Sequence, residues 1–256
     1  MQLKIQSNND SGFLSSLPPA TRHLLIINVL VWLATFALLK SNSGIDLFQV
    51  LGLHYFKGTD FHVYQLFTYM FMHSLSISHI FFNMFALWMF GTVLERNFGT
   101  KFFLFFYIVS GLGAGVLQEL TWMYDLRPFA EEITKWMNTD LSNGLNVHDK
   151  IVYSVDELTQ WVHESYYNRF TTVGASGSVF GLLAGFAMLF PNQPMYIMFI
   201  PIPIKAKYVM IGYAAIELFC GVQNFSWDNV AHFAHLGGAI VGVILCIMWK
   251  RGMLRF

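Results

Sequence analysis

Six apolar runs set the strongest limit on how this chain can fold. They lie at residues 23–40, 78–96, 102–121, 175–191, 206–222 and 231–249. A helix needs about 20 mainly apolar residues to cross the roughly 30 Å hydrocarbon layer of a bilayer. Only 12% of the residues are charged, whereas an average soluble domain has about 25%. The sequence therefore predicts an all-α, polytopic membrane domain with six transmembrane helices.

The charges between the runs predict the orientation of this domain. If six spans alternate in direction, basic residues gather on one side: Lys4, Arg22, Arg96, Lys101, Lys205, Lys207, Lys250, Arg251 and Arg255. Acidic residues gather on the other, and the positive-inside rule then places both termini in the cytoplasm. We predict a cytoplasmic tail over residues 1–22, a membrane domain over 23–250 and a second cytoplasmic tail over 251–256.

The connection between the third and fourth runs, residues 122–171, is unusually long for a loop. Its stretch RPFAEEITKWM places Pro128 in a plausible first helical turn and three large apolar residues on one face. Its stretch SVDELTQWVHESYYNRF opens with Ser154 and Glu157 in capping-box spacing. We predict an extracytoplasmic insertion that contains two short amphipathic helices.

Residues 41–77, which connect the first two runs, are too aromatic for a plain solvated loop. Aromatic rings favour the headgroup depth of a bilayer. This segment therefore either lies in the membrane interface or packs against the helical bundle.

The fourth run opens with small residues, in the stretch TTVGASGSVFGLLAGF at 171–186. Gly177, Gly181 and Gly185 recur every four residues, a pattern typical of a seam where two membrane helices approach closely. Ser176 lies at the start of this seam. The glycine pattern alone predicts only close helix packing, so the serine needs partners before it indicates chemistry.

Polar and ionisable side chains inside membrane spans are costly and indicate function. The predicted spans contain five of interest: His79, Asn83, Glu217, His232 and His235. Ser176 begins an inward-running helix, as do His79 and His235. Asn83 follows His79 by one helical turn. These side chains are therefore predicted to lie at a similar depth near the outer face.

The residue types at this depth suit nucleophilic catalysis. A neutral histidine near pH 7 can take the proton of a serine hydroxyl and make it a nucleophile. Its attack creates an oxyanion that needs donors, and His79 and Asn83 emerge on one helix face. The backbone N–H of Ser176, at a helix start, is a third donor. Glu217 and Asp228 are alternatives for orienting the histidine without support from spacing, so the pattern favours a Ser–His dyad over a triad.

Three motifs resemble those of the rhomboid intramembrane serine proteases: HIFFN in the second run, GASG opening the fourth and AHLGGAIVG in the sixth. Their order and the six-span layout are similar from about residue 20 to 250, apart from the insertion. The resemblance implies that Ser176 is the nucleophile and His235 the general base. It implies that His79 and Asn83, with the Ser176 N–H, stabilise the oxyanion. The stretch AHFAHLGG also offers His232 as a base, but only His235 has the family context.

The resemblance also implies supporting residues around this pair. Phe180 should stack on the base without donating a hydrogen bond. The small residues expected to support the site are Gly174, Gly177, Gly238 and Gly242. The last two would let the sixth helix press against the fourth.

The function that the resemblance implies is hydrolysis of a peptide bond in or near a transmembrane segment. The expected partners are single-span or polytopic membrane proteins and the lipid bilayer, with no nucleic acid, no metal and no cofactor. The sequence leaves the oligomeric state open. The expected location is a bacterial inner membrane, with the site opening to the extracytoplasmic side and residues 223–230 as a cap.

Two other functions compete with hydrolysis. An inactive rhomboid-like protein would bind membrane clients, but such proteins lose the serine or the histidine, and this chain has both. A metal or proton transporter would use the histidines and Glu217. A transport path needs polar groups through to the inner face, whereas the inner halves of these runs are apolar.

Overall fold

The computed structural model describes residues 12–41, 43–147, 150–196, 202–223 and 230–254. Helices occupy all six apolar runs, and their ends agree with the predicted ends to within a few residues. They are α1 (Pro19–Lys40), α4 (Ile77–Ala86) continued by η3 (Leu87–Gly91) and α5 (Thr92–Phe98), α6 (Thr100–Asp125), α9 (Ser176–Leu189), α10 (Ala206–Gln223) and α11 (His232–Lys250).

Within the described residues, four helical stretches are long and apolar enough to cross a membrane: α1, the continuous stretch 77–98, α6 and α11. α9 has only 14 residues. At 1.5 Å per residue it rises about 21 Å, less than the roughly 30 Å of a hydrocarbon layer. α10 has 18 residues but includes Lys207 and Glu217, and it is not among the four. The six-span arrangement therefore stays a prediction.

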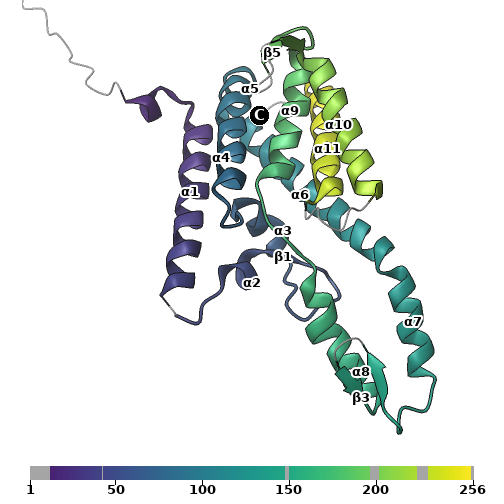
Figure 1. The fold of residues 1–256 in the computed structure, drawn as a ribbon. Coiled ribbons are helices and arrows are strands. Elements are labelled where there is room, and N and C mark those ends of the chain that lie inside the picture. Colours follow the sequence, from purple (N-terminus) through teal and green to yellow (C-terminus); the bar gives the residue numbers. More distant parts are fainter. Residues whose placement is uncertain (1–11, 42, 148–149, 197–201, 224–229, 255–256) are drawn as a thin grey trace, which may run out of the picture.

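α9 is the central helix of the bundle, and most of its side chains are buried. It packs mainly against α6 and α11. The outer helices differ: α1 exposes Leu30 and Phe36, and α10 exposes Ile211 and Phe219. Apolar surface of this extent marks a face that meets lipid or protein. The start of α1 and the end of α11 lie at the same end of the bundle (Figure 1).

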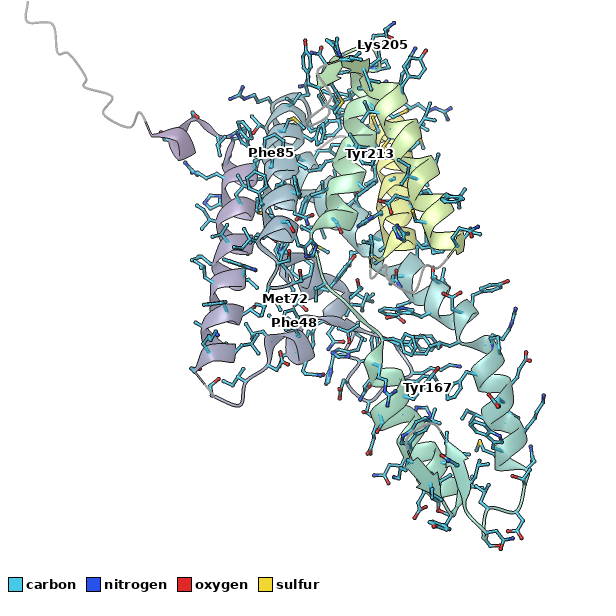
Figure 2. All side chains as sticks on the ribbon, viewed as in Figure 1. Phe48, Met72, Phe85, Tyr167, Lys205 and Tyr213 are labelled. Atoms are coloured by element: carbon cyan, nitrogen blue, oxygen red, sulfur yellow. The ribbon has the colours of Figure 1, made fainter. Side chains whose placement is uncertain are left out.

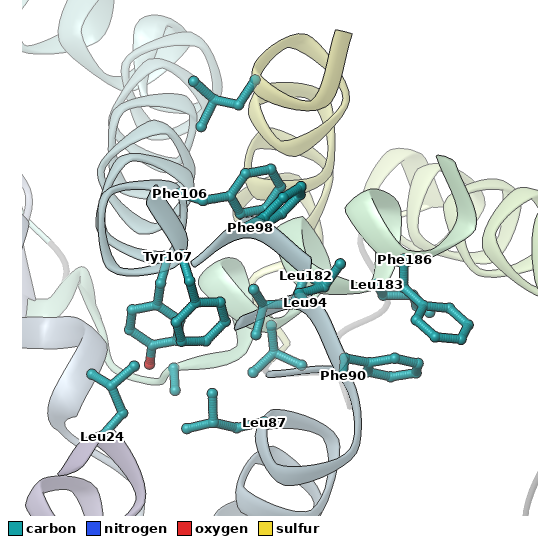
Figure 3. Packing of buried hydrophobic residues seen from close by; sticks show 14 of the residues in the cluster. Leu24, Leu87, Phe90, Leu94, Phe98, Phe106, Tyr107, Leu182, Leu183 and Phe186 are labelled. Carbon is teal, nitrogen blue, oxygen red and sulfur yellow. The ribbon is translucent and has the colours of Figure 1, made fainter. Parts of the chain in front are cut away.

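The apolar core lies between α1, the stretch 77–98, α6 and α9 (Figure 3). Leu24 of α1, Leu94 of α5 and Leu182 of α9 point into it. The rings of Phe98 and Phe106 pack beside them with centroids 5.3 Å apart. Close packing of large side chains resists displacement, so this core holds the central helix, and the serine at its start, in place.

A buried carboxylate joins α1 to the second helical stretch. Glu95 of α5 accepts hydrogen bonds from the backbone N–H groups of Ala20 (2.9 Å) and Thr21 (2.7 Å). It also accepts from the hydroxyls of Thr21 (2.8 Å) and Thr100 (2.9 Å). The first N–H groups of a helix have no intrahelical acceptor, and a negative charge there is favourable. Glu95 therefore caps α1 from a neighbouring helix.

The segment at 41–77 packs against the bundle, which was one of the two alternatives that the sequence left open. Its elements are α2 (Leu47–Leu51), β1 (Leu53–His54), α3 (Gln65–Thr68) and η2 (Tyr69–Phe71). Tyr69 and Met70 are buried in the main core, whereas Val63 and Phe67 face outward. β1 pairs with β4 (Thr171–Thr172), directly before the small-residue motif. This pairing ties the segment to the start of α9.

Residues 126–170 form a small folded unit, here called the extension, which projects from the bundle end opposite β5 (Figure 1). Its elements are α7 (Arg127–Met137), β2 (Leu145–Val147), β3 (Lys150–Val152), α8 (Val155–Trp161), η4 (Val162–Tyr166) and η5 (Tyr167–Arg169). A second apolar cluster, with Ile133, Leu158 and Trp161 among its buried residues, fills its interior. Tyr167 belongs to this cluster and lies far from Lys205 at the other end (Figure 2).

The two amphipathic helices predicted in this region are confirmed as α7 and α8. Pro128 lies in the first turn of α7. Ser154 caps α8 by accepting the N–H of Glu157 (3.2 Å), and Glu157 accepts the N–H of Tyr153 (2.8 Å). The hairpin of β2 and β3 was not predicted, because its three-residue strands are too short to show an alternating pattern.

The mostly helical character that the sequence predicts is confirmed. The described residues also contain three two-stranded antiparallel pairs, which were not predicted: β1 with β4, β2 with β3, and β5 (Pro194–Tyr196) with β6 (Pro203–Lys205). Each pair satisfies backbone hydrogen bonds in a connection that packs on the helices. Most of the expected cap at 223–230, with Asp228, lies outside the described residues, as do parts of both tails.

Candidate active site

Ser176 and His235 lie in hydrogen-bond contact although 59 residues separate them. Ser176 is the first residue of α9, and His235 stands in the first turn of α11. The distance from Ser176 Oγ to His235 Nε2 is 2.8 Å. This is the geometry in which an imidazole can take the proton of a hydroxyl.

Glycine pairs make this contact possible. A Cβ atom at Gly238 would collide with the carbonyl oxygen of Gly177. One turn on, a Cβ at Gly242 would lie 2.6 Å from the carbonyl oxygen of Gly181. α9 and α11 therefore meet backbone to backbone, as small residues allow.

The ring of Phe180 lies flat on His235, with centroids 4.3 Å apart and planes inclined by 7°. Tyr213 of α10 meets the edge of Phe180 at 6.1 Å. The stack covers one face of the imidazole and limits its rotation. Phe180 has no polar atom, so it orients the ring by packing alone.

His79 faces the serine from α4. A Cβ placed on Gly174 would lie 3.2 Å from His79 Nε2 and 3.4 Å from Ser176 Oγ. The φ angle of Gly174 is +142°, a conformation that favours glycine. Its N–H donates to the carbonyl oxygen of Tyr69 (3.0 Å), which holds the loop beside the two side chains.

Ser74 determines which nitrogen of His79 carries the proton. The Ser74 backbone N–H donates to His79 Nδ1 at 3.3 Å, and the Ser74 hydroxyl lies 2.9 Å from the same atom. Because a backbone N–H can only donate, Nδ1 must be the acceptor. A neutral His79 then carries its proton on Nε2, the atom that faces the serine. Sequence reasoning missed Ser74 because it precedes the helix and belongs to no motif.

Asn83 lies one turn along α4 and lines the same cavity as His79. Its side-chain nitrogen donates to the carbonyl oxygen of His79 at 2.9 Å. An amide nitrogen has two hydrogens, so one remains to face the cavity. The bond to its own helix backbone fixes the orientation of this donor.

His73 supports His79 from the side, with ring centroids 5.2 Å apart. It is fully buried, and neither ring nitrogen has a hydrogen-bond partner among the described residues. Burial, with a smaller contribution from His79, lowers the pKa of His73 to about 3. His73 is therefore uncharged at neutral pH and packs as an apolar group.

Behind His235, the structure places a carboxylate that sequence spacing did not support. Glu217 Oε2 lies 3.1 Å from His235 Nδ1 and 2.6 Å from His232 Nδ1. The first contact is a close approach rather than an aligned hydrogen bond, because His235 Nδ1 has no partner of good geometry among the described residues. His232, the alternative base, forms a hydrogen bond with Glu217. The imidazole that contacts the hydroxyl of Ser176 is that of His235.

Ser176, His235, His79 and Asn83 line a cavity of about 820 Å³. It lies between α4, α9 and α10, and its remaining wall is largely apolar, with side chains such as Phe85 and Tyr213. Figure 2 labels Phe85 and Tyr213 on the two outer helices of this wall. No group of three His, Cys, Asp or Glu side chains within the described ranges is arranged to hold a metal ion.

Comparisons with known proteins find similarity over most of the chain. A family model described as Rhomboid domain matches residues 60–126 and 151–251. The unmatched residues between these two parts hold α7 and β2 of the extension. The matched parts contain every residue of the site, from His79 to His235.

Three relatives illustrate the similarity. The chain is 30% identical over 209 residues to RHOMBOID-like protein 12, mitochondrial, of Arabidopsis thaliana, which covers 81% of this chain and 52% of the relative. It is 26% identical over 182 residues to Rhomboid protease AarA of Providencia stuartii, and the match covers 67% of this chain and 51% of the relative. It is 28% identical over 167 residues to Rhomboid protein 1, mitochondrial, of Saccharomyces cerevisiae, and the match covers 65% of this chain and 36% of the relative.

The chain thus spans about half the length of the first two relatives and less of the third. Two of the three names place the relative in mitochondria, which conflicts with the bacterial inner membrane predicted from the sequence. The match to the family model covers more than half of the chain and includes both helix starts that form the site. The chain therefore belongs to the rhomboid family.

Proposed function

We propose that this protein is an intramembrane serine endopeptidase that cuts membrane proteins in or near their transmembrane segments. The single observation that carries the proposal is the 2.8 Å contact between Ser176 Oγ and His235 Nε2 in the wall of a largely apolar cavity. One of the relatives is itself named a rhomboid protease.

The geometry supports a two-step acyl transfer. His235 Nε2 takes the hydroxyl proton while Ser176 Oγ attacks the peptide carbonyl carbon. The new oxyanion meets His79 Nε2–H, the Asn83 amide and the Ser176 N–H. The tetrahedral intermediate collapses, the C–N bond breaks, and the proton on His235 passes to the leaving amine. Water then hydrolyses the Ser176 ester with His235 again as the base.

The shape and lining of the cavity support a transmembrane substrate. Its volume of about 820 Å³ can hold a few side chains but not a whole helix. The scissile carbonyl must be free of its helical hydrogen bond before attack. The substrate therefore enters between α4 and α10 as a locally unwound segment, with a small residue at the cut.

A second cavity, of about 310 Å³ and with a more polar wall, supports a route for the hydrolytic water. It lies beside His232 and is lined by Gln118 and Asp125 of α6, among others. The side-chain oxygen of Gln118 is buried and has no partner among the described residues. A water held there would satisfy this oxygen. Thr171 and Ala231 line both cavities, which connects this one to the cavity of Ser176 and His235.

The arrangement in the membrane is part of the proposal. All six helical stretches cross the bilayer, both termini lie on the side with most lysine and arginine, and the extension lies on the opposite side with the active site. The mitochondrial names of two relatives favour a mitochondrial membrane over a bacterial one. Fractionation of tagged protein, with protease protection of each tail, would test the location and both ends.

Labelling with a fluorophosphonate probe tests the catalytic proposal, together with cleavage of a tagged single-span substrate by detergent-solubilised protein. Ser176→Ala and His235→Ala should abolish both signals. Ser178→Ala, a matched change two residues further along α9, should leave labelling intact. His232→Ala should retain most cleavage. A wild-type protein that neither labels nor cuts across a broad substrate panel would instead favour a protein that binds membrane clients without cleaving them.

A further inference from the structure

Glu217 is an unusual residue for its helix. α10 exposes large apolar side chains along most of its length, and its described buried residues are Ala206, Val209 and Glu217. Glu217 is only 8% exposed. A buried carboxylate in a membrane helix is costly unless it is paired. Glu217 is the single buried residue in the C-terminal half of α10. This position indicates that the role of its carboxylate depends on the side chains that it contacts there.

The groups that it meets are two imidazoles of α11. The same oxygen, Oε2, lies 2.6 Å from His232 Nδ1 and 3.1 Å from His235 Nδ1. His235 in turn presents Nε2 to Ser176 Oγ at 2.8 Å. The four side chains therefore form a continuous polar chain, in the order His232, Glu217, His235 and Ser176, that links α10, α11 and α9.

These contacts favour the protonation state in which His235 can act as a base. To take the serine proton, Nε2 must be unprotonated, so the proton of neutral His235 must lie on Nδ1. A carboxylate only accepts hydrogen bonds, and it therefore favours the Nδ1–H form beside it. When His235 becomes positively charged during attack, the negative charge of Glu217 stabilises it. An orienting carboxylate behind a catalytic histidine acts in both ways.

Among the described residues, the other groups around His235 do not supply these effects. His79 of α4 lines the same cavity as His235, and on α9 His235 contacts Ser176 and Phe180. None of these three side chains is a carboxylate. His232, on the same helix, donates to Glu217 rather than to His235.

We propose that Glu217 is a positioning residue for His235, held in place by His232, and that it converts the Ser–His pair into a Ser–His–Glu triad. This inference rests on the proposed peptidase function and goes beyond the dyad expected from the sequence. Glu217 does not touch the substrate, so its contribution is to the protonation pattern and charge of the base.

The test compares three substitutions by the kinetics of fluorophosphonate labelling, measured as the maximal rate and the half-saturating probe concentration. Glu217→Gln keeps the shape and an acceptor oxygen but loses the charge. Glu217→Asp keeps the charge on a shorter side chain. Glu217→Ala loses both. Glu95→Gln, the same substitution at a buried glutamate that caps α1, is the matched control, and thermal unfolding reports folding for each variant.

A triad predicts that Glu217→Ala lowers the maximal rate by about tenfold to hundredfold, less than the roughly 10⁴-fold loss when an aligned triad aspartate is neutralised. The maximal rate of Glu217→Gln should fall nearly as far, and Glu217→Asp should retain part of the wild-type rate. The half-saturating concentration should stay unchanged in all three. His232→Ala should cost less than Glu217→Ala, because the carboxylate still faces His235.

Two results would overturn the inference. One is a maximal rate in Glu217→Gln equal to that of the wild type. The other is a loss in Glu217→Asp at least as large as in Glu217→Gln, which would assign Glu217 to packing alone. Failure of the peptidase proposal has a different signature, because then the wild-type serine itself would not react with the probe.

Discussion

Gly238 of α11 lies against the carbonyl oxygen of Gly177 on α9 so closely that no side chain fits between the two helices. Gly177 directly follows Ser176, and Gly238 lies about one turn after His235. The distance between the proposed nucleophile and its base, which must be correct to a fraction of an ångström, is therefore determined by two residues that have no side chains.

Gly238→Ala should separate α9 from α11 and lower both stability and activity. Overpacking of this kind costs about 1–3 kcal/mol, and the labelling rate of Ser176 should fall with it. Gly212→Ala is the matched control, since a Cβ there meets no atom within 4 Å. It should leave labelling unchanged and stabilise α10 by about 0.5–1 kcal/mol. Thermal unfolding and probe labelling of both variants check the pair, and equal behaviour would contradict the role given to Gly238.

His79→Ala should reduce the maximal rate of cleavage by about 10²- to 10³-fold, the usual cost of one oxyanion donor. Ser74→Ala should cost less, because the Ser74 backbone N–H still bonds His79 Nδ1. Ser76→Ala is the control: its hydroxyl contacts Ser78 and not the imidazole. Steady-state cleavage of a tagged substrate gives the three rates. A Ser74→Ala enzyme with the same rate as Ser76→Ala would show that the hydroxyl does not orient His79.

Glu95→Ala should lower the unfolding free energy by at least about 2 kcal/mol, because it leaves the first N–H groups of α1 buried and without an acceptor. Asn97→Ala, two residues further along α5, should have a small effect, since its side chain is exposed and donates to the carbonyl oxygen of Val93 in its own helix. Unfolding of the solubilised protein in a denaturant series measures both. The Ser176 labelling rate of the folded fraction should not change in either variant.

Leu158→Ala should loosen the extension without disturbing the catalytic pair. Leu158 is buried in the cluster of the extension, whereas Leu182 is buried in the main core. Each truncation to alanine should cost about 2–5 kcal/mol locally. Hydrogen exchange should rise only over residues 126–170 in Leu158→Ala, with normal labelling of Ser176, while Leu182→Ala should slow labelling. Slow labelling in both would make the extension part of the site.

The helices were predictable because the signals for each one lie within a continuous stretch of the sequence. Apolar runs long enough for a bilayer, a capping pair at Ser154 and Glu157, and Pro128 in a first turn are local signals, and local backbone energetics acts on them directly. The common depth of Ser176 and His235 was also within reach, because alternating spans constrain where each helix begins.

Other features needed the tertiary structure. The sequence shows that Glu217 is on the fifth helical stretch, but not how that helix is rotated about its axis, and a rotation by half a turn would point the carboxylate at lipid. Ser74 and the pairing of β1 with β4 depend on connections that carry no periodic signal.

The sequence by itself thus determined the helices, their order and the residue types that gather at one depth, because hydrophobic length and backbone capping are properties of neighbouring residues. Only the tertiary structure decided that the carboxylate of Glu217 stands behind His235. That choice depends on the packing of α10 against α11, where side chains distant in sequence settle the rotation of each helix.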